Sequence, residues 1–143
     1  MENIIEIKNL SFRYKNKFIF DDFTMDIKRG TWVTIAGANG AGKTTLVKIL
    51  AGLEKHYSNI KILNMDLNKK NLFNIRKEVG LVFDNPDSFF ACETVEDELA
   101  FSLENLAVAP ATIKKKIDEV SKILKLDNLL KRNPFLLSGG EKQ

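Results

Sequence analysis

The chain has 143 residues, of which 44% are hydrophobic and 29% charged, so its composition allows one compact core and excludes a disordered tail. Its 22 basic and 19 acidic residues leave a formal charge of +3, too small to indicate a nucleic acid or an anionic membrane as partner. With one cysteine, Cys92, and one histidine, His56, neither an internal disulfide nor a structural zinc site is expected. No apolar run is long enough to span a bilayer and the start lacks the layout of a signal peptide, so we expect a protein of the cytosol.

The first third of the chain alternates between apolar and polar residues, as half-buried strands do. The alternation runs over residues 5–27 with polar breaks at 15–17 and 21–22, which predicts antiparallel strands separated at these breaks. Residues 32–36 are almost continuously apolar, which predicts a strand buried on both faces. Directly after a glycine-rich stretch, apolar residues at helical spacing predict a helix over residues 43–53.

The middle of the chain carries the pattern of further strands and a short helix. We expect strands at residues 60–63 and 80–83, with a helix over residues 72–79 between them. The second of these strands is expected to end at residues 84–87, Asp-Asn-Pro-Asp, which have the composition of a turn.

After residue 88 the pattern becomes helical. Thr94 and Asp97 have the spacing of a capping box, which predicts a helix to about Asn105. Pro110 is placed to begin a second helix, and a short third helix is expected over residues 127–132. The apolar face of the second helix recurs at intervals of three and four residues: Ile113, Ile117, Val120, Ile123 and Leu124.

Residues 37–45 carry the strongest chemical signal. They match the pattern G-x-x-x-x-G-K-[ST] and lie between a predicted buried strand and a predicted helix start, which is the context that the pattern requires. The residues are Gly37, Ala38, Asn39, Gly40, Ala41, Gly42, Lys43, Thr44 and Thr45. A glycine-rich turn that precedes a helix by chance is the alternative, and the combined order of strand, loop, Lys-Thr and helix disfavours it.

The residue types in this loop suit a phosphate ligand. Gly37, Gly40 and Gly42 allow the backbone to adopt positive φ and to approach a ligand, so that successive N–H groups point into one concavity. Lys43 supplies a cation for the outer phosphates and Thr44 a hydroxyl for Mg²⁺, while the helix adds its positive N-terminal end. We therefore expect a nucleotide with Mg²⁺ at this loop.

A second motif lies at residues 137–143, Leu-Ser-Gly-Gly-Glu-Lys-Gln. A serine followed by two glycines at a helix start exposes N–H groups and a hydroxyl, which makes another platform for anions. An ordinary serine N-cap with a glycine turn is the alternative. Together with the phosphate loop, the motif resembles the signature sequence of the ATP-binding cassette (ABC) proteins, which implies that Ser138, Gly139 and Gly140 contact ATP held by a second subunit.

The resemblance covers essentially the whole chain and implies an α/β fold, the P-loop NTPase fold of ABC type with an N-terminal antiparallel β subdomain. It implies that the parallel-sheet core is only partial, because the Walker B strand would follow residue 143. It also implies a division into antiparallel and core strands over about 1–36, the phosphate loop and its helix over 37–53, core strands and the Q-loop region over 54–87, a helical subdomain over 88–137 and the start of the signature helix over 138–143.

The resemblance is closer for one branch of the family. Residues 79–87 and 94–101, together with residues 11–14, are similar to the ATPase subunits of energy-coupling-factor importers and their cobalt-type relatives. The interval between Gly42 and Ser138 suits a transporter cassette and is too short for the long coiled coil of chromosome-maintenance relatives. The resemblance to this branch is what implies transport of vitamins or metal ions.

The resemblance also implies roles for residues outside the two motifs. Tyr14 matches the aromatic residue that stacks on adenine, and the alternative is a strand tyrosine that packs on its neighbours. Asp84 stands where the family usually has the glutamine of the Q-loop, which contacts Mg²⁺ and the attacking water. An aspartate can also ligate Mg²⁺, but it adds negative charge near the γ-phosphate. The implied catalytic positions are thus Lys43 and Asp84, and the implied metal ligands are Thr44 and Asp84.

Several other residues have more than one interpretation. Phe89 and Phe90 either form part of a groove for the coupling helix of a membrane subunit or pack beneath their own loop. His56 is expected to be a solvated loop residue, and Cys92 a packing or surface thiol without a nucleophilic role. Residues 114–116, three lysines, are expected to lie on the solvated face of a helix, with contact to lipid headgroups as the alternative.

The function that the resemblance implies is ATP binding and hydrolysis coupled to import of a vitamin or a metal ion. The implied partners are a second ABC ATPase subunit, identical or different, a transmembrane coupling protein and a substrate-binding membrane protein, at the cytoplasmic face of the membrane and without nucleic acid. Because the catalytic glutamate would follow residue 143, these 143 residues alone are expected to bind nucleotide weakly without hydrolysing it. A degenerate regulatory cassette and a soluble ABC ATPase that acts on ribosomes or nucleic acid remain the alternatives.

Overall fold

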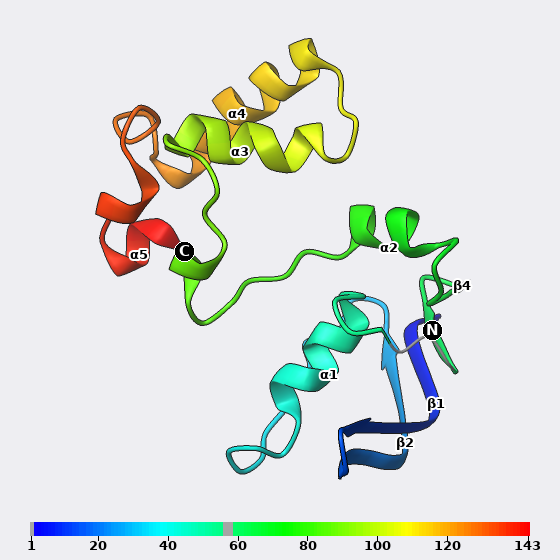
Figure 1. Ribbon diagram of the computed structural model, residues 1–143. Helices are drawn as coiled ribbons and strands as arrows, with labels where there is room; N and C mark the ends of the chain where they lie inside the picture. Colours follow the sequence, from blue (N-terminus) through cyan, green and yellow to red (C-terminus); the bar gives the residue numbers. More distant parts are fainter. Residues whose placement is uncertain (1, 56–58) are drawn as a thin grey trace. The chain divides into compact units, whose positions relative to one another are not determined.

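The computed structural model describes residues 2–55 and 59–143, which divide into two compact units, Met1–Leu81 and Val82–Gln143 (Figure 1). The first unit contains β1 (Asn3–Tyr14), β2 (Lys17–Lys28), α1 (Lys43–Leu50), β3 (Ile60–Ile62), β4 (Met65–Asp66) and α2 (Leu72–Glu78). The second contains η1 (Pro86–Ser88), α3 (Val95–Glu104), α4 (Pro110–Leu124), η2 (Pro134–Leu136) and α5 (Gly139–Lys142). Chain length predicts one compact domain and excludes two independent cores, and this prediction is wrong: the described residues divide into two compact units, and α3 and α4 pack on each other in the second.

The sheet of the first unit has the strand order β2-β1-β3-β4, and each neighbouring pair is antiparallel. The antiparallel prediction is confirmed, but the polar break at residues 21–22 does not end a strand. Asp22 and Asn9 both adopt positive φ, and the Asn9 amide donates to the Asp22 carboxylate across the hairpin. The register of β1 against β2 shifts near these residues, so they form irregularities within two long strands and do not end either strand.

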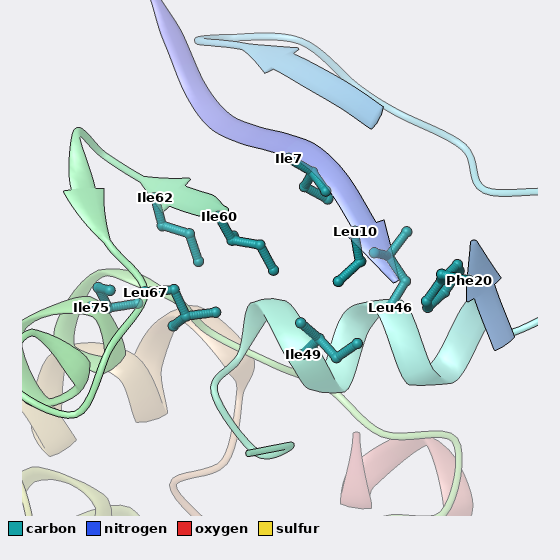
Figure 2. Packing of buried hydrophobic residues seen from close by; sticks show 9 residues of the cluster. All are labelled: Ile7, Leu10, Phe20, Leu46, Ile49, Ile60, Ile62, Leu67 and Ile75. Carbon is teal, nitrogen blue, oxygen red and sulfur yellow. The ribbon is translucent and has the colours of Figure 1, made fainter. Parts of the chain in front are cut away.

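One face of this sheet packs on α1 to form the core of the first unit. Figure 2 shows Leu46 and Ile49 of α1 directed toward Ile7 and Leu10 of β1. Phe20, Ile60, Ile62, Leu67 and Ile75 complete the buried cluster. Leu46 and Ile49 are three residues apart, so they lie on one face of the helix, and their burial holds the N-terminal end of α1 in place.

Two predicted buried strands do not form. Residues 32–36 and residues 80–83 have no assigned strand, and Trp32 and Val82 are exposed. A strand needs a neighbour to accept and donate its backbone hydrogen bonds, and the sheet of the described residues offers none to either segment. The prediction of a partial parallel-sheet core is therefore wrong for the described residues, whereas the α/β class holds.

The helices of the second unit begin where the capping residues predict. The Thr94 hydroxyl accepts a hydrogen bond from the Asp97 N–H at 3.1 Å, so Thr94 is the N-cap of α3, and α4 begins at Pro110. Residues 114–116 are exposed on α4, as expected for a solvated face. Across the described ranges, 2–55 and 59–143, no helix has both the length and the apolar character needed to cross a bilayer.

Two predictions for the second unit are wrong: the short third helix, and part of the apolar face of α4. Residues 127–132 form turns instead of a helix. The carbonyls of Leu130 and Arg132 accept hydrogen bonds from the N–H groups of Glu96 and Val95, the first residues of α3, at 2.9 and 3.0 Å, which attaches these turns to α3. In the predicted stripe of α4, Ile113 and Ile117 are buried, whereas Val120, Ile123 and Leu124 are exposed because the second unit places no element over them.

Candidate functional site

The loop of residues 37–42 leads directly into α1, whose first residue is Lys43. The N-cap, Gly42, makes no side-chain hydrogen bond to the helix, and the first turn contains no acidic residue. The N–H groups of a first helical turn have no partners within the helix, and the positive end of the helix dipole lies there. Residues 37–41 are exposed, so this end of α1 is open to an anion.

Glycine is required at two positions of this loop for different reasons. Gly40 and Gly42 have φ values of 82° and 94°, a region that residues with a side chain rarely adopt. A Cβ at Gly42 would lie 2.6 Å from the Cγ2 of Ile19 and 3.0 Å from the Cζ of Phe20, both on β2. A Cβ at Gly40 would meet nothing within 4 Å, so the space there is available to a ligand.

The Lys43 side chain folds back over the loop that precedes it. Its Nζ donates hydrogen bonds to the carbonyls of Gly37 at 2.8 Å and Ala38 at 2.9 Å. The ammonium group is therefore placed above the loop, and the exposed Thr44 follows it in the first turn of α1. The two carbonyl oxygens are neutral acceptors, so a phosphate oxygen can replace them as a stronger, charge-assisted partner.

Tyr14, the last residue of β1, lies near the same helix. Its hydroxyl donates to the Glu54 carboxylate at 2.5 Å, and its ring meets Phe12 edge-on at 5.0 Å. The hydrogen bond to Glu54, with smaller contributions from burial and the Glu54 charge, raises the pKa of Tyr14, while a hydrogen bond with Thr45 acts in the opposite direction. Contact with Thr45 places Tyr14 beside the first turn of α1, and the ring is half exposed.

Asp84 lies in the second unit and begins the loop of residues 84–92 (the 84–92 loop). The Asp84 carboxylate is exposed and accepts a hydrogen bond from the Asn85 N–H at 3.0 Å. Phe89 stacks on Phe83 with ring centroids 3.7 Å apart, and Phe90 meets Phe135 edge-on at 5.7 Å. Both phenylalanines thus pack within their own unit, although Phe89 keeps about half of its surface exposed.

The far end of the 84–92 loop is held by Glu98, which the sequence analysis did not single out. The Glu98 carboxylate accepts hydrogen bonds from the N–H groups of Ala91 at 3.0 Å and Cys92 at 2.9 Å. Burial, followed by the charge of Glu98, raises the pKa of the Cys92 thiol, so the thiol stays protonated near neutral pH and is a poor nucleophile.

The signature segment, residues 137–143, begins α5. Ser138 is its N-cap, and the Glu141 carboxylate accepts hydrogen bonds from the Ser138 N–H at 2.8 Å and hydroxyl at 2.6 Å. These bonds lower the pKa of Glu141. The capping box could have been predicted from the S-x-x-E spacing. Gly139 and Gly140 are exposed, and a Cβ on either would meet nothing within 4 Å.

The structure therefore brings the predicted residues together in two groups, one in each unit. The first group is the loop of residues 37–42, the start of α1 and Tyr14; the second is the 84–92 loop with the signature segment. His56 lies outside the described residues. The sequence analysis did not identify Glu54 as the partner of Tyr14 or Glu98 as the partner of the 84–92 loop. Neither glutamate is adjacent in the sequence to the residues that it binds, so no local pattern indicated them.

A phosphate loop before a helix, packed on an antiparallel sheet and accompanied by a small helical unit, defines a P-loop NTPase fold. The sequence model of the ABC transporter family matches residues 20–143. The chain belongs to the ABC transporter family, as its signature segment indicates.

Two relatives are described as energy-coupling factor transporter ATP-binding proteins EcfA1. The one from Streptococcus pneumoniae is 44% identical over 147 residues, which cover 100% of this chain and 54% of that protein. The one from Ligilactobacillus salivarius is 42% identical over 144 residues, which cover 99% of this chain and 51% of that protein. The chain thus spans about half the length of the curated relatives it matches.

Solved structures support the same fold. The structure of CbiO1 from Clostridium perfringens, described as part of the ABC transporter complex cbiONQ, matches with a TM-score of 0.81 at 28% identity, covering 99% of this chain and 58% of that one. An ATP-binding cassette dimer in a post-hydrolysis state, bound to ADP and Pi, matches with a TM-score of 0.78 at 23% identity, covering 96% and 65%. The second likeness concerns the fold alone.

Proposed function

We propose that the complete protein is the ATP-binding subunit of a membrane importer and couples ATP binding and hydrolysis to transport. The observation that carries the proposal is the position of the Lys43 ammonium over the carbonyls of Gly37 and Ala38, at a helix start without acidic residues. A cation and unpartnered N–H groups directed at one exposed loop suit a polyphosphate. Membership of the ABC transporter family supports ATP as that ligand.

The roles of the loop residues follow from their chemistry. On binding, Lys43 exchanges the two carbonyls for phosphate oxygens, and Gly40 leaves the space in which the backbone N–H groups approach them. Tyr14, half exposed beside the first turn of α1, offers a ring face to adenine.

The donor set suits Mg²⁺ held mainly by the nucleotide. No group of three or more His, Cys, Asp or Glu side chains in residues 2–55 and 59–143 could hold a metal ion by itself. Mg²⁺ in nucleotide sites takes phosphate oxygens and few protein ligands. In the first unit, Thr44 would supply one hydroxyl oxygen; the carboxylate of Asp84, in the second unit, is the other ligand that the resemblance to the Q-loop implies. Bound Mg²⁺ supplies charge neutralisation for phosphoryl transfer.

The signature segment implies that the subunit works as a dimer. Each phosphate loop would face Ser138, Gly139 and Gly140 of a second ABC subunit, identical or different, with the nucleotide between them. The relatives described as energy-coupling factor transporter ATP-binding proteins support a transmembrane coupling protein and a substrate-binding membrane protein as partners. The subunit would then lie on the cytoplasmic face of the membrane and power import of a vitamin or a metal ion.

The proposal is tested on the complete gene product by ATP hydrolysis and by binding of a fluorescent ATP analogue. Lys43→Ala removes the cation over the loop and should abolish hydrolysis and weaken analogue binding by at least about tenfold. The matched control is Lys48→Ala, which removes a lysine from the last turn of the same helix. The control should hydrolyse ATP at the wild-type rate, and equal rates for Lys43→Ala and the wild type would contradict the proposal.

A second candidate, a regulatory cassette that binds ATP without turnover, is favoured by Asp84. The resemblance implies that an aspartate at the Q-loop position adds negative charge near the γ-phosphate, and the exposed Asp84 carboxylate accepts the Asn85 N–H. If this cassette is regulatory, the complete wild-type protein should bind ATP and lack turnover, and Asp84→Gln should restore hydrolysis. Wild-type turnover that Asp84→Gln leaves unchanged would exclude this candidate.

A further inference from the structure

The 84–92 loop and α5 are joined by an ion pair between residues 55 positions apart in the sequence. The Lys142 Nζ donates to the Asp87 carboxylate at 2.8 Å. The Lys142 side chain is only 13% exposed, whereas that of Asp87 is 50% exposed. Most of the Lys142 side chain is covered by protein, so this pair is better shielded than an ion pair between two exposed side chains, and it holds Asp87 against α5.

Both ends of this ion pair are held by their own local structure. Asp87 lies in η1, where its N–H donates to the Asn85 side chain at 3.2 Å. Lys142 lies in α5, where its N–H donates to the Ser138 carbonyl at 3.0 Å, within the turn that the Ser138 and Glu141 capping box closes. The ion pair therefore connects two defined turns.

A second contact joins the 84–92 loop to η2, the turn just before the signature segment. Phe90, in the 84–92 loop, meets Phe135 of η2 edge-on at 5.7 Å, and η2 ends two residues before Ser138. Phe90 also lines a cavity of about 410 Å³ together with Gly140 and Lys142. The 84–92 loop thus contacts η2, just before the signature segment, and Lys142, after the glycines of that segment.

From these contacts we infer that the Asp87–Lys142 ion pair is a positioning link, which fixes the position of the signature segment relative to the 84–92 loop. This inference rests on the proposed function, because it gives Ser138, Gly139 and Gly140 the task of meeting the partner's nucleotide. Asp84 is three residues before Asp87 in the same loop, so the ion pair connects α5 to the loop that carries Asp84. Neither Asp87 nor Lys142 contacts the reacting groups in this scheme.

The link predicts a specific separation of kinetic effects in the complete protein. Lys142→Met and Asp87→Asn should each lower kcat for ATP hydrolysis by at least about fivefold, as expected for loss of a coupled pair. Binding of a fluorescent ATP analogue should weaken by much less than kcat falls, because neither residue belongs to the phosphate loop that holds the nucleotide. The charge-swapped double variant, Asp87→Lys with Lys142→Asp, should recover at least half of the lost turnover.

The matched control is Lys115→Met, which breaks the exposed ion pair of Lys115 with Glu119 on α4, where the side chains are 78% and 59% exposed. This variant should keep the wild-type kcat, since exposed pairs contribute little. Lys43→Ala separates the two proposals: if hydrolysis survives it, the proposed function fails. If hydrolysis is lost in Lys43→Ala, two results overturn the positioning link. In the first, the kcat of Lys142→Met equals that of Lys115→Met. In the second, the kcat, the analogue binding and the melting temperature of Lys142→Met all fall together.

Discussion

Gly42 and Ile19 approach so closely that a Cβ on the glycine would lie 2.6 Å from the Ile19 Cγ2. The contact brings the N-cap of α1 against β2, and Phe20 on the same strand belongs to the core beneath the helix. The glycine therefore serves the packing of the helix on the sheet in addition to the turn of the phosphate loop. Any side chain at this position would displace the start of α1, and Lys43 with it.

Gly42→Ala should lower the free energy of unfolding by about 2 to 4 kcal/mol, the combined effect of a positive φ and an overpacked contact with β2. Urea unfolding followed by circular dichroism measures the change. Gly40→Ala is the matched control, since Gly40 also has positive φ but its Cβ would meet nothing within 4 Å. The control should lose only about 1 to 2 kcal/mol, and equal losses in the two variants would contradict the role of the Ile19 contact.

Signals confined to a few neighbouring residues predicted local structure well. Thr94 at its N-cap, Pro110 at a helix start and Lys43 as the first residue of α1 are all confirmed. Each of these predictions depends on hydrogen bonds or dihedral angles within one helical turn. The geometry of the loop at residues 37–42 has the same origin, because its glycines, Lys43 and the helix start are contiguous; its phosphate chemistry stays a prediction.

Features that depend on distant segments were not predictable. The apolar runs at residues 32–36 and 80–83 indicate burial, but a strand forms only where a neighbour accepts its hydrogen bonds, and the described residues supply none. Residues 127–132 form turns whose Leu130 and Arg132 carbonyls bond to the first residues of α3, a long-range contact that no local pattern indicates. The Asp87–Lys142 ion pair joins residues 55 positions apart, a separation that neither helix nor strand periodicity predicts.

The Tyr14 hydroxyl should titrate above its ordinary pKa of 10.0, chiefly because the hydrogen bond to Glu54 favours the protonated phenol. The stability that this bond contributes is therefore fully present below pH 10 and is lost as the pH rises through the raised pKa. Ultraviolet titration of these 143 residues in a Tyr57→Phe background, which leaves Tyr14 as their single tyrosine, measures the midpoint. Glu54→Gln should move the midpoint back toward 10, whereas Glu2→Gln should not move it.

The capping box of α5 makes a prediction for acidic pH. Hydrogen bonds from Ser138 lower the pKa of Glu141 below 4.5, so the stability they contribute is present above pH 4.5 and is lost as the pH falls through the lowered pKa. Ser138→Ala should raise the pKa of Glu141 toward 4.5, which carboxyl chemical shifts followed by NMR would report. Ser102→Ala, a serine-to-alanine change in α3, is the control, and a shift of the same size in both variants would show that the capping box is not the cause.

The N-cap of α3 offers the most direct test of a sequence prediction. Thr94→Ala removes the acceptor of the Asp97 N–H, at 3.1 Å, together with the hydroxyl that donates to the Asp97 carboxylate at 2.5 Å. The free energy of unfolding should fall by about 1 kcal/mol in urea titrations. Thr94→Ser keeps the hydroxyl and should recover most of the lost stability. If the serine variant is as unstable as the alanine variant, the effect comes from the lost methyl group and not from the N-cap. Thr112→Ala, at an exposed position of α4, should lose less than Thr94→Ala because it removes no N-cap.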